Sequence, residues 1–158
     1  MHDIYRVHAT APPAVDSSSE GATLEVVVMF TGVKETLAAL RSAASLAQGL
    51  SARIRLVVPQ PVPFPAELDQ PPVGREFTER RFLTLAEQSG VDTHVDIRIC
   101  RDWQAGAMHN LKPGVTVVIG VRWPRWWPRR RERKLAQALR ARGHHVLLVD
   151  VKPETRHA

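Results

Sequence analysis

The residues best suited to bind a partner lie in one short run rich in tryptophan, arginine and proline, Arg122–Arg131. Arginine pairs with phosphate in a two-pronged geometry, and tryptophan suits the boundary between water and an apolar layer. The run begins where the apolar segment Gly114–Val121 ends, and that segment has the composition of a strand buried on both faces. Ligands of open parallel sheets bind outside the carboxyl ends of the strands. The run is therefore the first candidate for a binding site.

Three interpretations of the segment Arg122–Lys134 remain open. It could bind an anionic surface, such as a nucleic acid or a lipid headgroup layer. It could instead pack against a protein partner, because tryptophan and arginine are enriched at binding hot spots. In the third interpretation, Trp123 and Trp126 cover the edge of the core and the arginines are solvated at the start of a helix. The candidate partner-binding residues are Trp123, Arg125, Trp126, Trp127, Arg129, Arg130 and Arg131.

Other polar pairs do not complete a catalytic or metal site in the sequence. The adjacent His144 and His145 have no third ligand at metal-site spacing, so we interpret them as loop residues. No nucleophile in a recognisable context accompanies any acid–base pair, and the sequence contains no complete phosphate loop. We therefore expect no enzymatic activity, no metal and no cofactor. The groups considered and set aside are the pairs His94 with Asp96 and Asp102 with His109, and the thiol of Cys100.

Composition restricts the class of protein. The 158 residues are 44% hydrophobic and 24% charged, which is typical of a globular domain with its own core. The net charge of +6 is matched by the segment Val121–Lys134 alone, so the sequence predicts one basic patch. A single cysteine suits a reducing compartment, and neither a signal peptide nor a membrane helix is evident. We expect a cytoplasmic protein.

Strand and helix patterns alternate along the chain, which predicts an α/β fold with a parallel sheet and helices on both faces. Glycines such as Gly49, Gly90 and Gly143 mark the helix ends. Prolines between residues 59 and 72 exclude helix or central strand there. The helix after these prolines has an apolar face that includes Phe77 and Phe82. The expected strands are Leu24–Phe30, Arg53–Val58, His94–Cys100, Gly114–Val121 and His145–Val151, and the helices are Lys34–Leu50, Gly74–Ser89, Asp102–Leu111 and Arg129–Arg142.

Differences among the strands predict their order. In the strand His94–Cys100, Val95, Ile97 and Ile99 alternate with polar residues, which is typical of a half-exposed strand at a sheet edge. The first and fourth strands are the most apolar, so we expect a five-stranded sheet in the order 3-2-1-4-5. The last strand would then be an apolar edge, and we expect a homodimer to form through it. The domain spans residues 23–152, between a mobile leader (1–22) and a tail (153–158).

Three segments resemble the universal stress protein domain, a five-stranded member of the adenine-nucleotide-binding α/β folds. Glu25–Gly32 with the following alanine-rich helix resembles the first strand and helix of that family. Ala52–Pro59 resembles its second strand. Val117–Gly120, with Ala138–Arg140 and Val146–Val149, resembles its last unit. The resemblance implies a stress-response protein and a dimer formed through the last strand.

The nucleotide-binding members of that family carry an acidic residue after the first strand and a glycine loop after the fourth. Glycine lets backbone N–H groups approach phosphates closely. Here the acidic position is Thr31, and of the loop positions only Gly120 is kept. Trp123, Arg133 and Lys134 occupy the others, so the resemblance predicts no ordinary binding of ATP or AMP. If a nucleotide does bind, the candidate residues are Thr31, Gly32, Val57, Gly120, Arg122, Arg133 and Lys134.

These observations predict a binding or regulatory module of the universal stress protein type that lacks ordinary ATP binding. Two alternatives remain. One is a nucleotide sensor whose remodelled loop holds phosphates with Arg122, Arg125 and Lys134. The other is a protein whose Trp/Arg segment binds a nucleic acid or a membrane surface.

Overall fold

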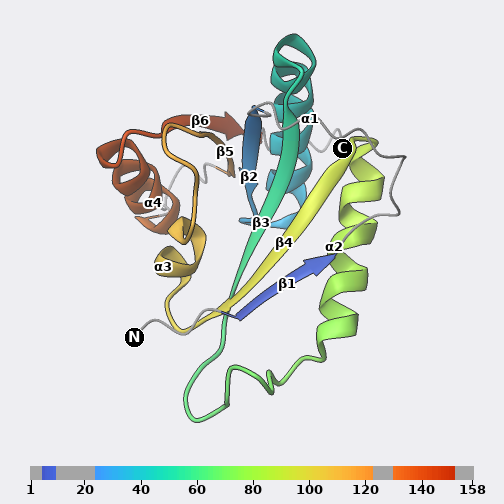
Figure 1. Cartoon of the computed structure of the whole chain (residues 1–158), viewed down its shortest axis with the longest axis vertical. Coiled ribbons are helices and arrows are strands. Elements are labelled where there is room, and N and C mark those ends of the chain that lie inside the picture. Colours follow the sequence, from blue (N-terminus) through green and yellow to red (C-terminus); the bar gives the residue numbers. More distant parts are fainter. Residues whose placement is uncertain (1–4, 10–23, 123–129, 152–158) are drawn as a thin grey trace, which may run out of the picture.

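The computed structural model describes residues 5–9, 24–122 and 130–151 of the chain. In this part, six strands form one sheet in the order β1-β4-β3-β2-β5-β6, accompanied by four helices (Figure 1). The strands are β1 (Tyr5–Ala9), β2 (Glu25–Met29), β3 (Arg53–Pro61), β4 (Thr93–Cys100), β5 (Thr116–Val121) and β6 (His145–Asp150). The helices are α1 (Val33–Leu50), α2 (Arg75–Ser89), α3 (Trp103–Met108) and α4 (Arg130–Ala141).

The five parallel strands confirm the order expected from the sequence. β2 lies between β3 and β5, β4 continues the sheet beyond β3, and β6 continues it beyond β5. In the numbering of the five expected strands, this order is 3-2-1-4-5. The connection from β3 to β4 therefore runs away from the centre on one side, and the connection from β5 to β6 runs away on the other.

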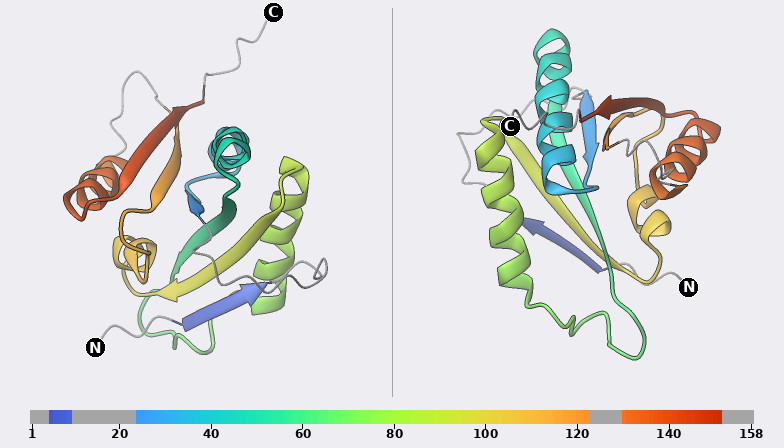
Figure 2. Two further views of the ribbon diagram at one scale, coloured as in Figure 1. Left: turned by 45° about the horizontal axis from the view of Figure 1, so that its top comes forward. Right: turned by 180° about the vertical axis from the view of Figure 1, so that it is seen from behind.

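Helices cover both faces of the sheet (Figure 2). On one face, α1 and α2 pack over Val26, Val28 and Leu56. On the other, α3 and α4 pack over Val27 and Met29 and their neighbours. Because successive side chains of a strand point to opposite faces, the unbroken apolar run of β2 supplies both cores.

The expectation that His94–Cys100 is a half-exposed strand at the sheet edge is wrong in its physical basis. β4 is the outermost parallel strand, yet Asp96 and Arg98 are completely buried. They alternate with apolar residues because the face of β4 towards α3 is filled by buried ion pairs. The alternation of apolar and polar residues therefore does not show whether the polar side chains face water or a buried charged partner.

Part of the segment expected to be a mobile leader forms a strand. β1 pairs antiparallel with the outer edge of β4, with Val7 opposite Ile97. The partner of β1 is some 90 residues away in the sequence, and five residues carry too short a pattern to reveal it. β1 covers an edge that would otherwise expose unpaired backbone groups.

The proline-rich connection begins later than expected, because β3 continues through Pro59 to Pro61. The carbonyl of Val57 accepts a hydrogen bond from the N–H of Phe30, at 2.9 Å, on the β2 side. Residues two apart on a strand point their backbone groups to the same side, so the nitrogen of Pro59 also faces the β2 side. It lies beyond the last residue of β2. A missing N–H costs little there, and proline is tolerated.

Candidate functional site

The carboxyl ends of β2 and β5 form the centre of the candidate site. These two parallel strands are neighbours, with Met29 opposite Ile119, and the chain leaves them towards opposite edges of the sheet. Ligands of open α/β sheets bind at such a reversal point. Of the residues expected from the sequence, the structure brings together Thr31, Gly32, Gly120 and Arg122.

Thr31 connects the two strand ends. Its buried hydroxyl donates a hydrogen bond to the carbonyl of Gly120, at 2.7 Å. Its backbone N–H donates to the hydroxyl of Thr36, at 3.4 Å. Thr31 therefore closes the gap between β2 and β5 instead of offering a polar group to a ligand.

Glu35, in the first turn of α1, fills the space between these strand ends. A side-chain carbon added at Gly120 would overlap the backbone of Glu35, and one added at Gly32 would overlap its carboxylate. Both glycines are therefore used for close packing of α1. The buried carboxylate of Glu35 forms an ion pair with Arg122, whose Nε lies 3.2 Å from Oε1. The side chain of Arg122 remains 43% exposed, so it closes the site from the solvent side.

Sequence reasoning missed Glu35. A signal was present, because Glu35 lies three residues after Gly32, the residue that precedes the first turn of α1. An acidic residue at this position compensates the positive end of the helix dipole and can reach back to the start of the helix. That pattern predicts a helix start, but not that the carboxylate would be enclosed by two strands.

The remaining residues expected around a nucleotide lie on β3 and α4. Val57 is completely buried in the sheet, in the core towards α3 and α4. Arg133 and Lys134 are exposed residues of α4. The expected partner-binding residues Trp123, Arg125, Trp126, Trp127 and Arg129 lie outside the described residues, as does the side chain of Arg130.

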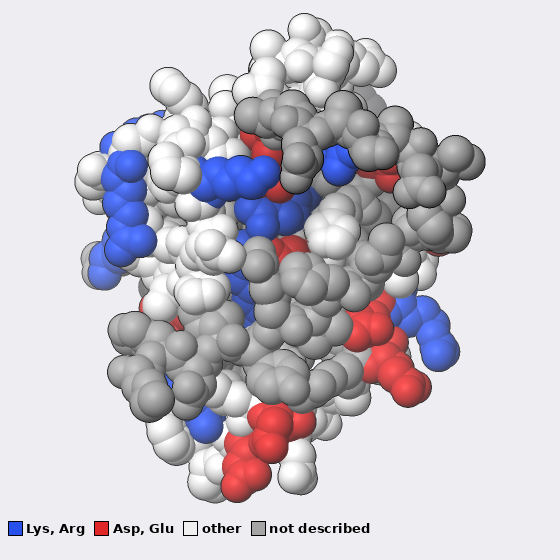
Figure 3. All heavy atoms as spheres, viewed as in Figure 1, with Lys and Arg blue, Asp and Glu red and all other residues white. Residues whose placement is uncertain are grey.

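Besides Arg122, the described part of the basic segment Arg122–Lys134 is the start of α4. Arg131 stacks over the ring of Trp103, with its Cζ 4.2 Å from the ring centroid, and its Nη2 lies 3.5 Å from Oε1 of the buried Glu132. Arg131 therefore already has partners within the fold. On the face shown in Figure 3, cationic side chains gather on the side where α4 lies in Figure 1. The exposed basic residues of α4 and its end are Arg131, Arg133, Lys134, Arg140 and Arg142.

The polar groups that were considered for catalysis are used in the packing of the fold. Asp96 belongs to the buried ion pairs of β4, and Asp102 caps α3 by accepting a 2.7 Å hydrogen bond from the N–H of Ala105. Cys100 is buried, although it ends the strand His94–Cys100 that the sequence predicts to be half-exposed. Burial, and secondarily the charge of Asp102, raises the pKa of its thiol to about 11. Among the described residues, no group of three or more His, Cys, Asp or Glu could hold a metal ion.

The sheet order and the site at its reversal point place the chain among the doubly wound α/β proteins, and within them it has the universal stress protein fold. It is similar to a universal stress protein from Archaeoglobus fulgidus, with a TM-score of 0.53 and 10% identity over 80% of this chain and 93% of that chain. It is also similar to a universal stress protein solved in complex with cAMP, with a TM-score of 0.50 and 16% identity over 82% of this chain and 98% of that one. No family model and no curated protein matches the sequence.

Within the described residues, no helix has the length and apolar character that crossing a membrane requires.

The residues at the β2–β5 ends do not fit a nucleotide phosphate held by glycine amides. Gly32 and Gly120 are packed against Glu35, and the nearest carboxylate would repel an added anion.

Proposed function

We propose that this chain is a binding or regulatory module with the universal stress protein fold, without catalytic activity and without ordinary adenine-nucleotide binding. The observation that carries the proposal is the position of the Glu35 carboxylate. It is buried between the ends of β2 and β5 and paired with Arg122 at 3.2 Å. A phosphate placed there would have to displace this carboxylate or remain beside it, and like charges in a partly dehydrated site repel strongly.

Thermal unfolding with ATP, AMP and cAMP tests the proposal. A ligand that binds only the folded state stabilises it by about 2.7 kcal/mol at 100 times its dissociation constant. We expect no concentration-dependent rise in Tm for the native protein at millimolar nucleotide. A rise that saturates with any of the three nucleotides would overturn the proposal.

Two variants identify the cause of the expected result. Glu35→Gln removes the charge at the reversal point and keeps the side-chain size, whereas Glu76→Gln makes the same change on the exposed first turn of α2. If the Glu35 carboxylate excludes phosphates, any gain of nucleotide binding will occur in Glu35→Gln and not in Glu76→Gln.

A nucleotide sensor is a second candidate, and the exposure of Arg122 favours it. Arg122 lies at the solvent side of the site and could exchange Glu35 for a phosphate, with Arg125 and Lys134 as further cations. In that case nucleotides raise the Tm of the native protein, and Arg122→Gln abolishes the rise.

A further inference from the structure

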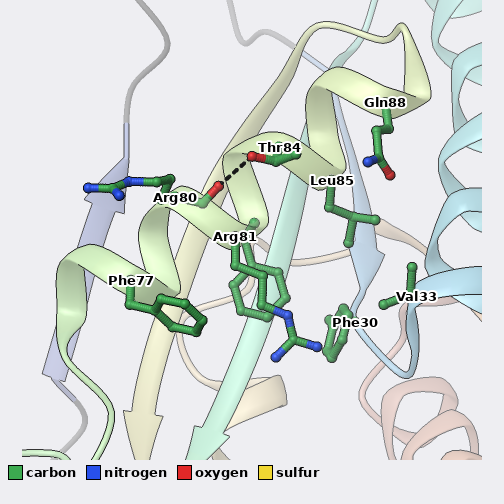
Figure 4. Close-up of a pocket in the computed structure, with 9 residues that line it drawn as sticks. Phe30, Val33, Phe77, Arg80, Arg81, Thr84, Leu85 and Gln88 are labelled. Atoms are coloured by element: carbon green, nitrogen blue, oxygen red, sulfur yellow. Dashed lines mark hydrogen bonds between the residues drawn. The ribbon is translucent and has the colours of Figure 1, made fainter.

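A cavity separate from the β2–β5 site lies between α2 and the end of β2. Its volume is about 430 Å³, within the range of roughly 300–1,000 Å³ typical of small-molecule sites. Phe30, just after β2, and Val33, the first residue of α1, line it on one side, and residues of α2 line it on the other (Figure 4). Thr31, the residue after Phe30, is instead bonded to Gly120 of β5. The two sites therefore lie on opposite sides of the β2 end.

Aromatic and aliphatic side chains form the walls. Phe30 and Phe82 meet edge to face, with ring centroids 4.8 Å apart, and make a fixed apolar surface. Phe77 and Val33 are 63% and 44% exposed, although the sequence predicts that Phe77 faces the core. Apolar side chains grouped around a concave surface favour a ligand that removes them from water.

Arg80 and Arg81 both line the cavity, and Arg81 is the one that extends among its apolar walls. Figure 4 shows Arg81 extending between Phe77 and Phe30, and its Cζ lies 5.6 Å from the centroid of the Phe82 ring. No carboxylate of the described residues forms an ion pair with Arg81. The guanidinium of Arg80 points away from Arg81 and Phe30 in the same view.

We propose that this cavity binds a small amphiphilic anion, namely a carboxylate with an aliphatic or aromatic body. The apolar part would cover Phe77 and Val33, and the carboxylate would pair with Arg81. A guanidinium beside apolar walls binds a carboxylate more strongly than in open water, because the surroundings are partly dehydrated. The inference does not depend on whether a nucleotide binds at the β2–β5 ends.

Calorimetric titration with decanoate and with decanol, its uncharged counterpart, tests the proposal. We expect saturable binding of decanoate with one site per chain and weaker binding of decanol. Arg81→Gln should weaken decanoate roughly tenfold, as expected for the loss of a charged hydrogen bond, and leave decanol unchanged. Arg41→Gln is the control, because it makes the same charge change at an exposed position of α1 that does not line the cavity, and it should keep the affinity within about twofold.

Phe77→Ala provides a test of the apolar wall with little risk to folding, because this side chain is mostly exposed. It should weaken decanoate and decanol alike, with an unchanged Tm in the absence of ligand. Equal losses in Arg81→Gln and Arg41→Gln would overturn the proposal, as would equal affinity for decanoate and decanol, or no saturable binding. So would a dimer that Phe77→Ala converts to monomer, because a second copy would then be the occupant.

Discussion

Asp96 and Arg98 lie two residues apart on β4, and their fully buried side chains form an ion pair with Nη2 2.9 Å from Oδ2. Arg98 also donates to the carbonyls of Gly106 and Ala107, at 3.0 and 3.1 Å, and thereby ties α3 to the sheet. Asp96 accepts a further contact from Arg55, at 3.4 Å. One carboxylate thus serves two arginines on the same face of the sheet.

Replacing Asp96 should be strongly destabilising. Asp96→Asn breaks the fully buried ion pair with Arg98, whereas Arg55 keeps Glu25 at 3.0 Å, and breaking a buried ion pair typically costs about 3–5 kcal/mol. Urea unfolding measures the loss. Asp92→Asn, an exposed site just before the same strand, should stay within about 0.5 kcal/mol of the native protein. Similar values for the two variants would contradict the assigned role of Asp96.

Gly120→Ala should destabilise the protein by about 1–3 kcal/mol or more, because the added carbon meets the backbone of Glu35, which cannot move without shifting α1. Gly49→Ala is the matched change in α1, where no atom lies within 4 Å of the added carbon. It should stabilise by roughly 0.5–1 kcal/mol, since alanine is the better helix former. Denaturant unfolding of both variants measures whether the free energy of unfolding falls in Gly120→Ala and rises in Gly49→Ala.

Cys100 should be unreactive in the folded protein at pH 8. Its pKa is raised to about 11 by burial and by Asp102, so almost no thiolate is present, and the sulfur is enclosed. Because the folded state holds this proton more tightly than the unfolded state, its contribution is complete below about pH 8.5 and is lost as the pH rises towards 11. A thiol-specific chromogenic reagent should react only after addition of urea. Rapid stoichiometric reaction without urea would contradict the buried position.

The outer edge of β6 is the predicted dimer contact. β6 pairs with β5 on one side, and Leu147 is 41% exposed. Leu147→Lys should convert a dimer to monomer at tens of micromolar, because a charge at an apolar edge prevents strand pairing. Light scattering gives the mass. Leu50→Lys, at the exposed end of α1 with 52% exposure, is the control and should remain a dimer. A monomeric native protein contradicts this prediction.

The basic segment should bind polyanions in a salt-dependent manner if it contacts phosphates, since neutralising phosphates releases counterions. Changing Arg129, Arg130 and Arg131 to Gln should abolish binding to an oligonucleotide or to anionic vesicles. The triple change of Arg41, Arg53 and Arg80 to Gln removes the same charge from exposed sites elsewhere and should retain binding. Equal effects of the two triple variants would mean that net charge alone is responsible.

The tryptophans of the segment distinguish its partners. Changing Trp126 and Trp127 to Ala should remove most affinity for vesicles if the partner is a membrane. If the partner is a protein, the same change should disrupt assembly and spare oligonucleotide binding. A loss of stability alone would indicate that these residues only cover the core.

The sequence by itself determined the α/β class and the approximate positions of the five parallel strands and the helices. The physical reason is that a strand or a helix is predicted from the spacing of apolar residues within a short segment of the chain. The sequence also predicted the order of these strands, although the half-exposed character on which it placed His94–Cys100 at the edge is wrong. The resemblance to universal stress proteins pointed to Thr31, Gly32 and Gly120, which the structure places together at the ends of β2 and β5.

Tertiary structure alone decided what the polar residues do. The alternation of β4 arises from Asp96 and Arg98 meeting Arg55 and α3, which are distant in the sequence or on another element. Glu35 fills the reversal point because α1 packs directly on Gly120, and Arg81 faces an open cavity because Phe77 does not reach the core. A charged side chain has the same local pattern whether it faces water or a buried partner, so only the packing of distant segments distinguishes the two.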